Sequence, residues 1–287
     1  MFVYEGGWRI SSYYKAIRTL HRYLKTRRYD VISARFGQCG VVARAQWRVP
    51  VVLMYGGSDI EGSPQFSGIH RYRHYVLRTV SWILSLLVDE VIVVSEHLGR
   101  KLPRRSYHVI NSGVDRSLFR PMVQAECRRK LGIGTTKRLA LFAGDPRNRR
   151  KRHELAVEAC RLASTTVDLE LVVLTGEPIA SVPVYMNACD VLLLTSTNEG
   201  SPNVVREALA CNLPIVSVNV GDVRERLDGV EGCRVCSDEA VETIARDLVE
   251  VVGPRQRLSP LDPHIGADTT QMADQLVRVY RKAVAAS

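Results

Sequence analysis

The sequence VLLLTSTNEGSPNVVREALACNLP, residues 191–214, joins an apolar run to a helical pattern. Val191–Leu194 is a continuous aliphatic run bounded by polar residues, which is typical of a strand buried on both faces of a parallel sheet. Ser201 is a favourable N-cap and Pro202 suits the first helical position, so a helix is expected to begin there. With the next expected strand, Ile215–Val218, the stretch forms a βαβ unit.

The same alternation of strands and helices runs through the chain and predicts doubly wound α/β sheets. Turn residues interrupt it between Asn111 and Met122, a segment predicted to join two domains. We expect a first domain over residues 1–115, a second over 116–269 and a final helix within 270–287. The other expected strands are Val31–Ala34, Val51–Met54, Val91–Val94, His108–Ile110, Leu139–Ala143, Leu169–Leu174 and Cys233–Cys236; further expected helices are Arg71–Leu87, His153–Ala163, Pro202–Cys211, Glu239–Val252 and Thr270–Val284.

The composition is that of a globular protein of two domains, with 287 residues, 46% hydrophobic and 24% charged. The longest apolar stretch, Val80–Val88, is about half the length of a membrane span, and no signal peptide is recognised at the start. The seven cysteines are scattered and are expected to be reduced core residues of a cytoplasmic protein. Cys233 and Cys236 have CxxC spacing without a second pair, which favours chance over zinc or redox chemistry.

Positive charge is concentrated in the first third of the chain. Residues 1–110 contain 17 Lys and Arg against 7 Asp and Glu, whereas residues 111–287 contain 23 of each kind. Much of the excess lies in two expected helices, Tyr13–Arg28 and His70–Arg78. A one-sided basic domain indicates an anionic membrane surface or nucleic acid as partner; the alternative is a solvated face without one. Aromatic residues near the cations favour the membrane: Tyr13, Tyr14, Tyr23, Tyr72, Tyr75 and Trp82.

The helix that follows Val191–Leu194 is expected to begin at the carboxyl edge of its sheet, where a helix N-terminus favours anions. No GxGxxG follows a strand and no GxxxxGK[ST] occurs, which argues against dinucleotide and P-loop sites. Five stretches point to a known family instead: GGSDIEG (56–62), NSGVDRSLFRP (111–121), FAGDPRNRRKRHEL (142–155), EGSPNVVRE (199–207) with its Glu-x7-Glu signature, and ALACNLPIVSVNVGDVRE (208–225). Through these stretches the chain resembles the retaining glycosyltransferases of the GT-B fold, the family 4 group.

The resemblance implies a GT-B pair of Rossmann-like domains and a role for each matching residue. Glu207 would accept hydrogen bonds from both ribose hydroxyls of a nucleotide. Lys151 and Glu199 would be the catalytic residues, with Lys151 stabilising the charge that develops on the leaving pyrophosphate. Neither a metal nor another cofactor is expected, because no DxD-like acidic pair is found. The donor-binding set is Gly144, Arg147, Lys151, Glu199, Gly200, Ser201, Pro202, Asn203 and Glu207.

A glycosidase is the rival enzyme class for two glutamates in one motif. Retaining glycosidases hold their two carboxyl groups about 5–5.5 Å apart. Glu199 and Glu207 are separated by roughly 10 Å along a helix axis at about 1.5 Å per residue. The spacing therefore argues against a glycosidase pair.

The chain departs from the family pattern at three places. Asp145 stands where the family has an arginine, so Arg147, Arg149 or Arg150 would have to replace it. Gly56 stands where a histidine is expected. Roughly 60–80 residues that usually open the first domain have no counterpart, judged against ordinary domain sizes, so we expect a shortened acceptor-side domain.

Three hypotheses follow. The leading one is a glycosyltransferase that moves a sugar with retention from a nucleotide-diphosphate donor to a lipid-linked or glycan acceptor. It would be cytoplasmic and peripheral at the inner face of the membrane. The second is a degenerate protein that binds nucleotide sugars without turnover. The third, a nucleic-acid binder, is disfavoured because it leaves Glu199 and Glu207 without a role.

Overall fold

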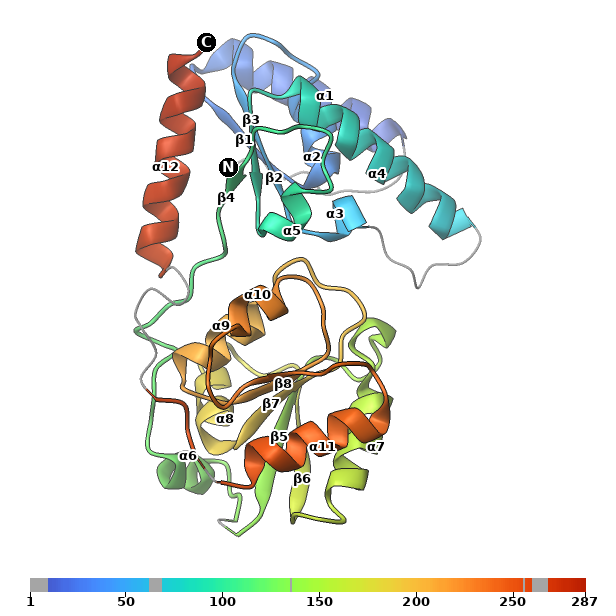
Figure 1. Cartoon of the computed structure of the whole chain (residues 1–287). Helices are drawn as coiled ribbons and strands as arrows, with labels where there is room; N and C mark the ends of the chain where they lie inside the picture. Colours follow the sequence, from blue (N-terminus) through green and yellow to red (C-terminus); the bar gives the residue numbers. More distant parts are fainter. Residues whose placement is uncertain (1–9, 62–68, 135, 255, 260–267) are drawn as a thin grey trace. The chain divides into compact units, whose positions relative to one another are not determined.

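The computed structural model describes residues 10–61, 69–134, 136–254, 256–259 and 268–287. The chain divides into two compact units. The first unit comprises Met1–Asn111 and Thr270–Ser287, and the second comprises Ser112–Thr269. Both are α/β units with parallel sheets (Figure 1).

The first unit is built on a four-stranded parallel sheet of order β1-β2-β3-β4. Alternate residues of β2 point to opposite faces, as the strand period requires. Leu53 packs against Leu84 and Val88, whereas Val52 packs against Val279. The strands are β1 (Ile32–Arg35), β2 (Val51–Tyr55), β3 (Glu90–Val93) and β4 (His108–Val109).

Helices cover both faces of this first sheet. The helices α1, α2 and α4 lie on the face towards which Leu53 points, and α12 covers the other face (Figure 1). Tyr280 of α12 hydrogen-bonds Ser33 of β1 at 2.9 Å, and Lys282 pairs with Glu90 of β3 at 2.9 Å. The helices are α1 (Ile10–Thr26), α2 (Phe36–Ala43), α3 (Ser58–Glu61), α4 (Ile69–Leu87), α5 (Glu96–Gly99) and α12 (Thr269–Ala285).

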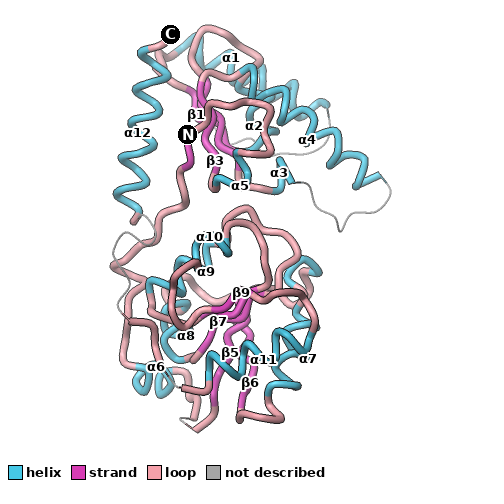
Figure 2. The backbone as a smooth tube through the Cα atoms, viewed as in Figure 1, coloured by secondary structure: helices cyan, strands magenta, loops and turns pink. Residues whose placement is uncertain are grey.

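The second unit is built on a five-stranded parallel sheet of order β6-β5-β7-β8-β9. The helices α7 and α11 pack together on one side, and α6 and α8 pack together on the other (Figure 2). The strands are β5 (Arg138–Ala143), β6 (Leu169–Leu174), β7 (Val191–Leu194), β8 (Ile215–Ser217) and β9 (Arg234–Val235). The helices are α6 (Gln124–Lys130), η1 (Arg149–Lys151), α7 (His153–Ala163), α8 (Val182–Ala188), α9 (Asn203–Ala210), α10 (Val223–Leu227) and α11 (Val241–Val252).

The predicted fold class is confirmed, because every predicted strand is present and every strand pair is parallel. β7 has the predicted bounds, pairs with β5 and β8, and is fully buried along its four residues. Six of the seven cysteines are buried, and all seven are free thiols. Burial raises the pKa of Cys233 to about 11 and that of Cys236 to about 12, as expected for core residues. None of the described helices is long and apolar enough to cross a membrane.

Candidate donor site in the second unit

Two loops meet at the carboxyl edge of the second sheet, because β5 and β7 are neighbouring parallel strands. The first loop follows β5 and the second follows β7. The Thr195 hydroxyl, fully buried, donates to the carbonyl of Lys151 at 2.7 Å. The backbone N–H of Thr197 donates to the carbonyl of Arg150 at 2.9 Å. These hydrogen bonds fix the two loops to each other.

The structure brings the two predicted catalytic residues together on these loops. Lys151 Nζ lies 2.6 Å from Glu199 Oε1, with the two side chains 17% and 12% exposed. The aliphatic part of Lys151 lies over Gly144, where a Cβ would approach Lys151 Cγ to 3.2 Å. Gly144 therefore leaves the space through which the lysine reaches the glutamate.

The Ser201–Asn203 segment is held by side chains and not by the predicted cap. The Ser201 hydroxyl donates to Asp222 Oδ2 at 2.6 Å and accepts from Arg206, which also donates to Asn203 Oδ1. Pro202 occupies the N-cap position of α9, which has no side-chain cap. The prediction that Ser201 caps the helix with Pro202 inside it is wrong, because Asp222 and Arg206 already bind the serine hydroxyl.

Arg206 is the centre of a buried cluster that was not predicted from the sequence. It is 2% exposed and Asp222 is 4% exposed, and Arg226 donates to Asp222 Oδ2 at 2.7 Å. Burial, together with the nearby charge of Arg226, lowers the pKa of Arg206 to about 10, against the opposing effect of Asp222. The sequence contained one signal of this cluster, because a charged residue stands at the buried helix position directly before Glu207.

A tight turn connects this cluster to Glu199. Gly221 has φ +57°, a left-handed conformation that glycine adopts readily. A Cβ at Gly221 would lie 2.5 Å from the carbonyl oxygen of Glu199. The turn thus packs against the backbone of Glu199 and the buried Gly200, while the next residue, Asp222, binds Ser201.

Glu207 differs from Glu199 in having no hydrogen-bond or ion-pair partner among the described residues. It lies half-buried on α9, and no hydrogen bond or ion pair to its carboxylate is found within the described part of the chain. Burial raises the pKa of Glu207, and the charge of Arg206 opposes this rise. A carboxylate removed from water without a partner is unfavourable, which is typical of a ligand-binding group.

Arg147 is not brought to the Lys151–Glu199 pair. Its side chain is 91% exposed, and its Nε and Nη2 each donate to Asp145 at 3.0 Å. This bidentate pair lowers the pKa of Asp145 and raises that of Arg147. Asp145, which stands where the family pattern has an arginine, therefore binds Arg147, one of the three arginines predicted to replace it.

Gly56 in the first unit has a structural reason for lacking the expected histidine. A Cβ at Gly56 would lie 2.6 Å from Cε1 of Phe36, so the aromatic ring fills that space. Phe36 has φ +66°, which is uncommon for a residue with a side chain. The neighbouring Asp59 accepts hydrogen bonds from Gly57 N at 3.0 Å and Gly37 N at 3.3 Å.

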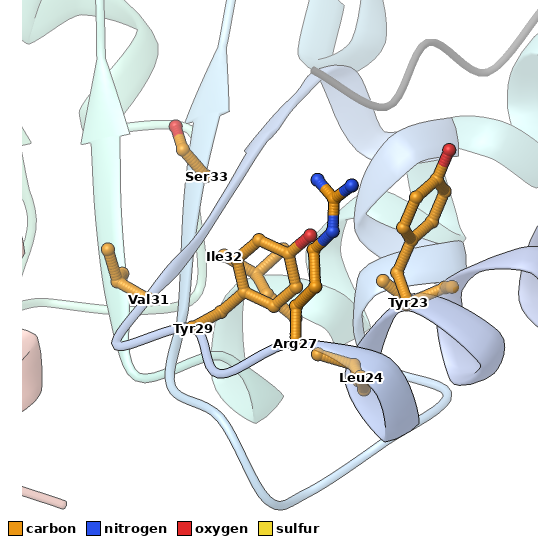
Figure 3. Close-up of a pocket in the computed structure, with 8 residues that line it drawn as sticks. Tyr23, Leu24, Arg27, Tyr29, Val31, Ile32 and Ser33 are labelled. Atoms are coloured by element: carbon orange, nitrogen blue, oxygen red, sulfur yellow. The ribbon is translucent and has the colours of Figure 1, made fainter.

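A cavity of about 430 Å³ also lies in the first unit, between the C-terminal half of α1 and the start of β1 (Figure 3). Half of its lining residues are aliphatic, and the other half carry polar groups: Tyr23, Arg27, Tyr29 and Ser33. It contains none of the predicted donor-binding residues, which all belong to the second unit. The site is therefore defined by the loops of the second sheet.

Two α/β units, each with a parallel sheet, agree with the GT-B fold that the sequence motifs predict. Residues 137–253 match the family described as "Glycosyl transferases group 1", and residues 1–118 match "Glycosyltransferase Family 4". The chain belongs to the group 1 glycosyltransferases, family 4, with the GT-B fold.

Known proteins of this family resemble the chain over most of its length. TuaC of Bacillus subtilis (strain 168), named as a glycosyltransferase of teichuronic acid biosynthesis, is 28% identical over 68% of this chain and 54% of its own length. The D-inositol 3-phosphate glycosyltransferase of Geodermatophilus obscurus is 26% identical over 89% of this chain and 67% of its own. The chain thus spans 54% and 67% of the lengths of these relatives.

Solved structures share the fold at lower identity. Sucrose-phosphate synthase from Thermosynechococcus elongatus aligns with a TM-score of 0.81 and 19% identity, covering 96% of this chain and 79% of that one. Anabaena HepE, solved in complex with UDP, aligns with a TM-score of 0.73 and 17% identity, covering 95% and 82%.

Proposed function

We propose that the chain transfers a sugar from a nucleotide-diphosphate sugar to an acceptor, with retention of anomeric configuration and without a metal ion. The observation that carries this proposal is the ion pair between Lys151 and Glu199 at 2.6 Å, at the carboxyl edge of β5 and β7. Family membership and the UDP-bound state of Anabaena HepE support a nucleotide-sugar donor.

Glu207 is the proposed ribose-binding group. An ionised carboxylate accepts hydrogen bonds through two oxygens, which suits two neighbouring hydroxyls. Its half-buried position and lack of a partner among the described residues support this role. The side chains of Ser201 and Asn203 are bound by Arg206, so this segment offers the donor its backbone N–H groups at the start of α9.

Lys151 is the proposed stabiliser of the leaving diphosphate. Its ammonium is paired with Glu199. When a diphosphate binds, the ammonium faces a second anion, and the attraction increases as the sugar–oxygen bond breaks and charge develops on the leaving oxygen. Glu199 then accepts hydrogen bonds from hydroxyls of the transferred sugar. The fixed charge of Lys151 and the N–H groups of α9 supply the stabilisation that a metal ion provides in other transferases.

Calorimetric titration of the full chain with UDP, GDP and ADP tests donor binding. The proposal predicts that one nucleotide binds selectively, and equal absence of binding for all three contradicts it. A panel of nucleotide sugars, followed for release of the nucleoside diphosphate, then tests turnover. One nucleotide could bind selectively while no donor releases its nucleoside diphosphate, with or without glycan and lipid-linked acceptors. That result would show a protein that only binds nucleotide sugars and is not a transferase.

A further inference from the structure

The helix α4 of the first unit exposes an apolar face. Every side chain of α4 that is both described and exposed is uncharged, although the helix lies in the most basic part of the chain. Tyr72 and Tyr75 are each 69% exposed, Leu86 is 59% exposed and Ile83 is 53% exposed. We call these residues the α4 face: Tyr72, Tyr75, Val76, Thr79, Ile83, Leu86 and Leu87.

The spacing of these residues places them on one side of the helix. Positions 72, 75/76, 79, 83 and 86/87 follow one another at intervals of three or four residues, the helical repeat, over about 22 Å at about 1.5 Å per residue. The opposite side of the helix carries Leu84 and Val88, which pack in the core with Leu53. An outer helix face is ordinarily polar, and a contiguous exposed apolar patch indicates a partner.

Cations lie on α1, which belongs to the same helix layer as α4. Both α1 and α4 pack on α2, on the same face of the first sheet (Figure 1). Ala16 and Leu20 hold α1 to this layer through Val42. The exposed side of α1 carries Lys15, Arg18, Arg22 and Lys25 at helical spacing.

The six aromatic residues expected at the membrane differ in their exposure. Tyr14, Tyr23, Tyr72 and Tyr75 are exposed, from 38% for Tyr23 to 69% for Tyr72. Tyr13 packs against the α1 core, and Trp82 lies half-buried with the Arg78 guanidinium 4.7 Å from its ring centre. The expected contribution of Tyr13 and Trp82 to an interfacial surface is therefore not supported, because both rings already have partners within the unit.

We infer that the α4 face and the cations of α1 form one surface that binds anionic lipid membranes. A bilayer interface accepts apolar and tyrosine side chains at the level of the headgroups, and acidic headgroups attract the neighbouring cations. A second copy of the chain would bring two sets of α1 cations together, which is unfavourable. Nucleic acid would use the cations but leave the α4 face in water. The surface belongs to the first unit and is independent of the proposed donor function.

Vesicle co-sedimentation of the full chain without nucleotide tests the α4 face. The probes are vesicles of phosphatidylcholine alone and of phosphatidylcholine with phosphatidylglycerol. The double variant Ile83→Gln/Leu86→Gln keeps good helix formers and should reduce partitioning to anionic vesicles about tenfold or more, because two exposed aliphatic groups leave the interface. The matched control Val277→Gln/Val284→Gln changes two exposed valines, each 42% exposed, on α12 at the other face of the sheet and should leave partitioning unchanged.

The cations are tested in the same assay. Lys15→Gln/Arg22→Gln should reduce anionic-vesicle binding about tenfold or more, from about 1 kcal/mol per cation near an anionic surface. The control Arg278→Gln/Arg281→Gln on α12 should bind like the parent. Raised salt should release the parent protein from the vesicles, because screening limits the range of attraction between surface charges to about 8 Å at physiological ionic strength and to less at higher salt. The proposal is overturned if the parent fails to bind anionic vesicles at low salt. It is equally overturned if sedimentation velocity shows a dimer that Ile83→Gln/Leu86→Gln dissociates while vesicle binding is unaffected.

Discussion

The two units share an architecture but place their polar and charged groups differently. In the second unit these groups gather at the carboxyl edge of the sheet, where Lys151, Glu199 and Arg206 are buried or half-buried and bind one another or their loops. In the first unit part of the excess of cations lies on the exposed side of α1, in the same helix layer as the uncharged α4 face. The comparison suggests that donor chemistry resides in the second unit and association with an anionic surface in the first. Each substitution considered next lies in the second unit and should leave the function of the first unit intact.

The largest effect is expected from Lys151→Ala. Removal of one group that stabilises developing charge typically lowers kcat by about 100- to 1,000-fold. Lys151 is not part of the apolar core, but its loss leaves the Glu199 carboxylate, 12% exposed, without its cation. The melting temperature should therefore fall modestly, on the scale of the roughly 1–3 kcal/mol that an unpaired buried polar group costs. Lys130→Ala, an exposed lysine of α6, is the control. A large fall in the melting temperature together with the loss of kcat would mean that Lys151 is structural. The contrast between the two units would then be lost.

Arg206→Leu should reduce the free energy of unfolding by about 2 kcal/mol, because Ser201 and Asn203 lose their buried partner. It should also raise the donor KM, since the Ser201–Asn203 segment loses its position. Arg206→Lys should recover stability in part but donor KM poorly, because an ammonium does not reproduce the planar fork that binds both residues. Arg224→Leu, at an exposed position of α10, is the control. Unchanged KM in a folded Arg206→Leu variant contradicts a positioning role.

Gly144→Ala should reduce kcat about tenfold while leaving donor affinity nearly unchanged. The added Cβ approaches Lys151 Cγ to 3.2 Å and moves the lysine by a few tenths of an ångström, and small misplacements of a catalytic group cost rate. Steady-state kinetics with the best donor of the panel measures this. Parent-like kcat would show that the path of Lys151 over Gly144 is not required.

The smallest effect concerns the thermal stability of Glu207→Gln. Burial raises the pKa of Glu207 in the folded chain above its ordinary value of 4.5, so the folded state holds this proton more tightly than the unfolded state. The stability that Glu207 contributes at low pH is therefore lost as pH rises from 4.5 through the raised pKa. At pH 7 the glutamine variant should be more stable than the parent by about 1 kcal/mol, the scale of an unpaired buried polar group. The difference should vanish near pH 4, and a destabilised variant at pH 7 would show that the carboxylate has a structural partner.

The fold followed from local patterns because each parallel strand is a short aliphatic run with polar limits. β7 has the predicted bounds for this reason, and the helix α7 also has its predicted bounds. The packing of α12 on the first sheet depends on contacts such as Tyr280 with Ser33, which are remote in sequence and leave no local signal.

The site was predictable as far as its motifs and not in its side-chain partners. The Lys151–Glu199 pair joins two motif residues, and the carboxyl edge of adjacent strands brings them together. The prediction that Ser201 caps α9 was wrong because Asp222, at the end of the next βα connection, binds the same hydroxyl. The position of Arg147 was equally hidden, because its partner Asp145 is the residue at which the chain departs from its family.

The central claim is that the second unit binds the donor nucleotide through Glu207, whose carboxylate has no hydrogen-bond or ion-pair partner among the described residues. Calorimetric titration of Glu207→Ala and of the control Glu158→Ala, an exposed glutamate of α7, with the nucleoside diphosphate that the parent selects tests it most directly. Glu207→Ala should weaken binding by about 1.5–3 kcal/mol, the scale of hydrogen bonds to a charged group, while Glu158→Ala binds like the parent. Parent-like affinity in a folded Glu207→Ala protein would contradict the claim.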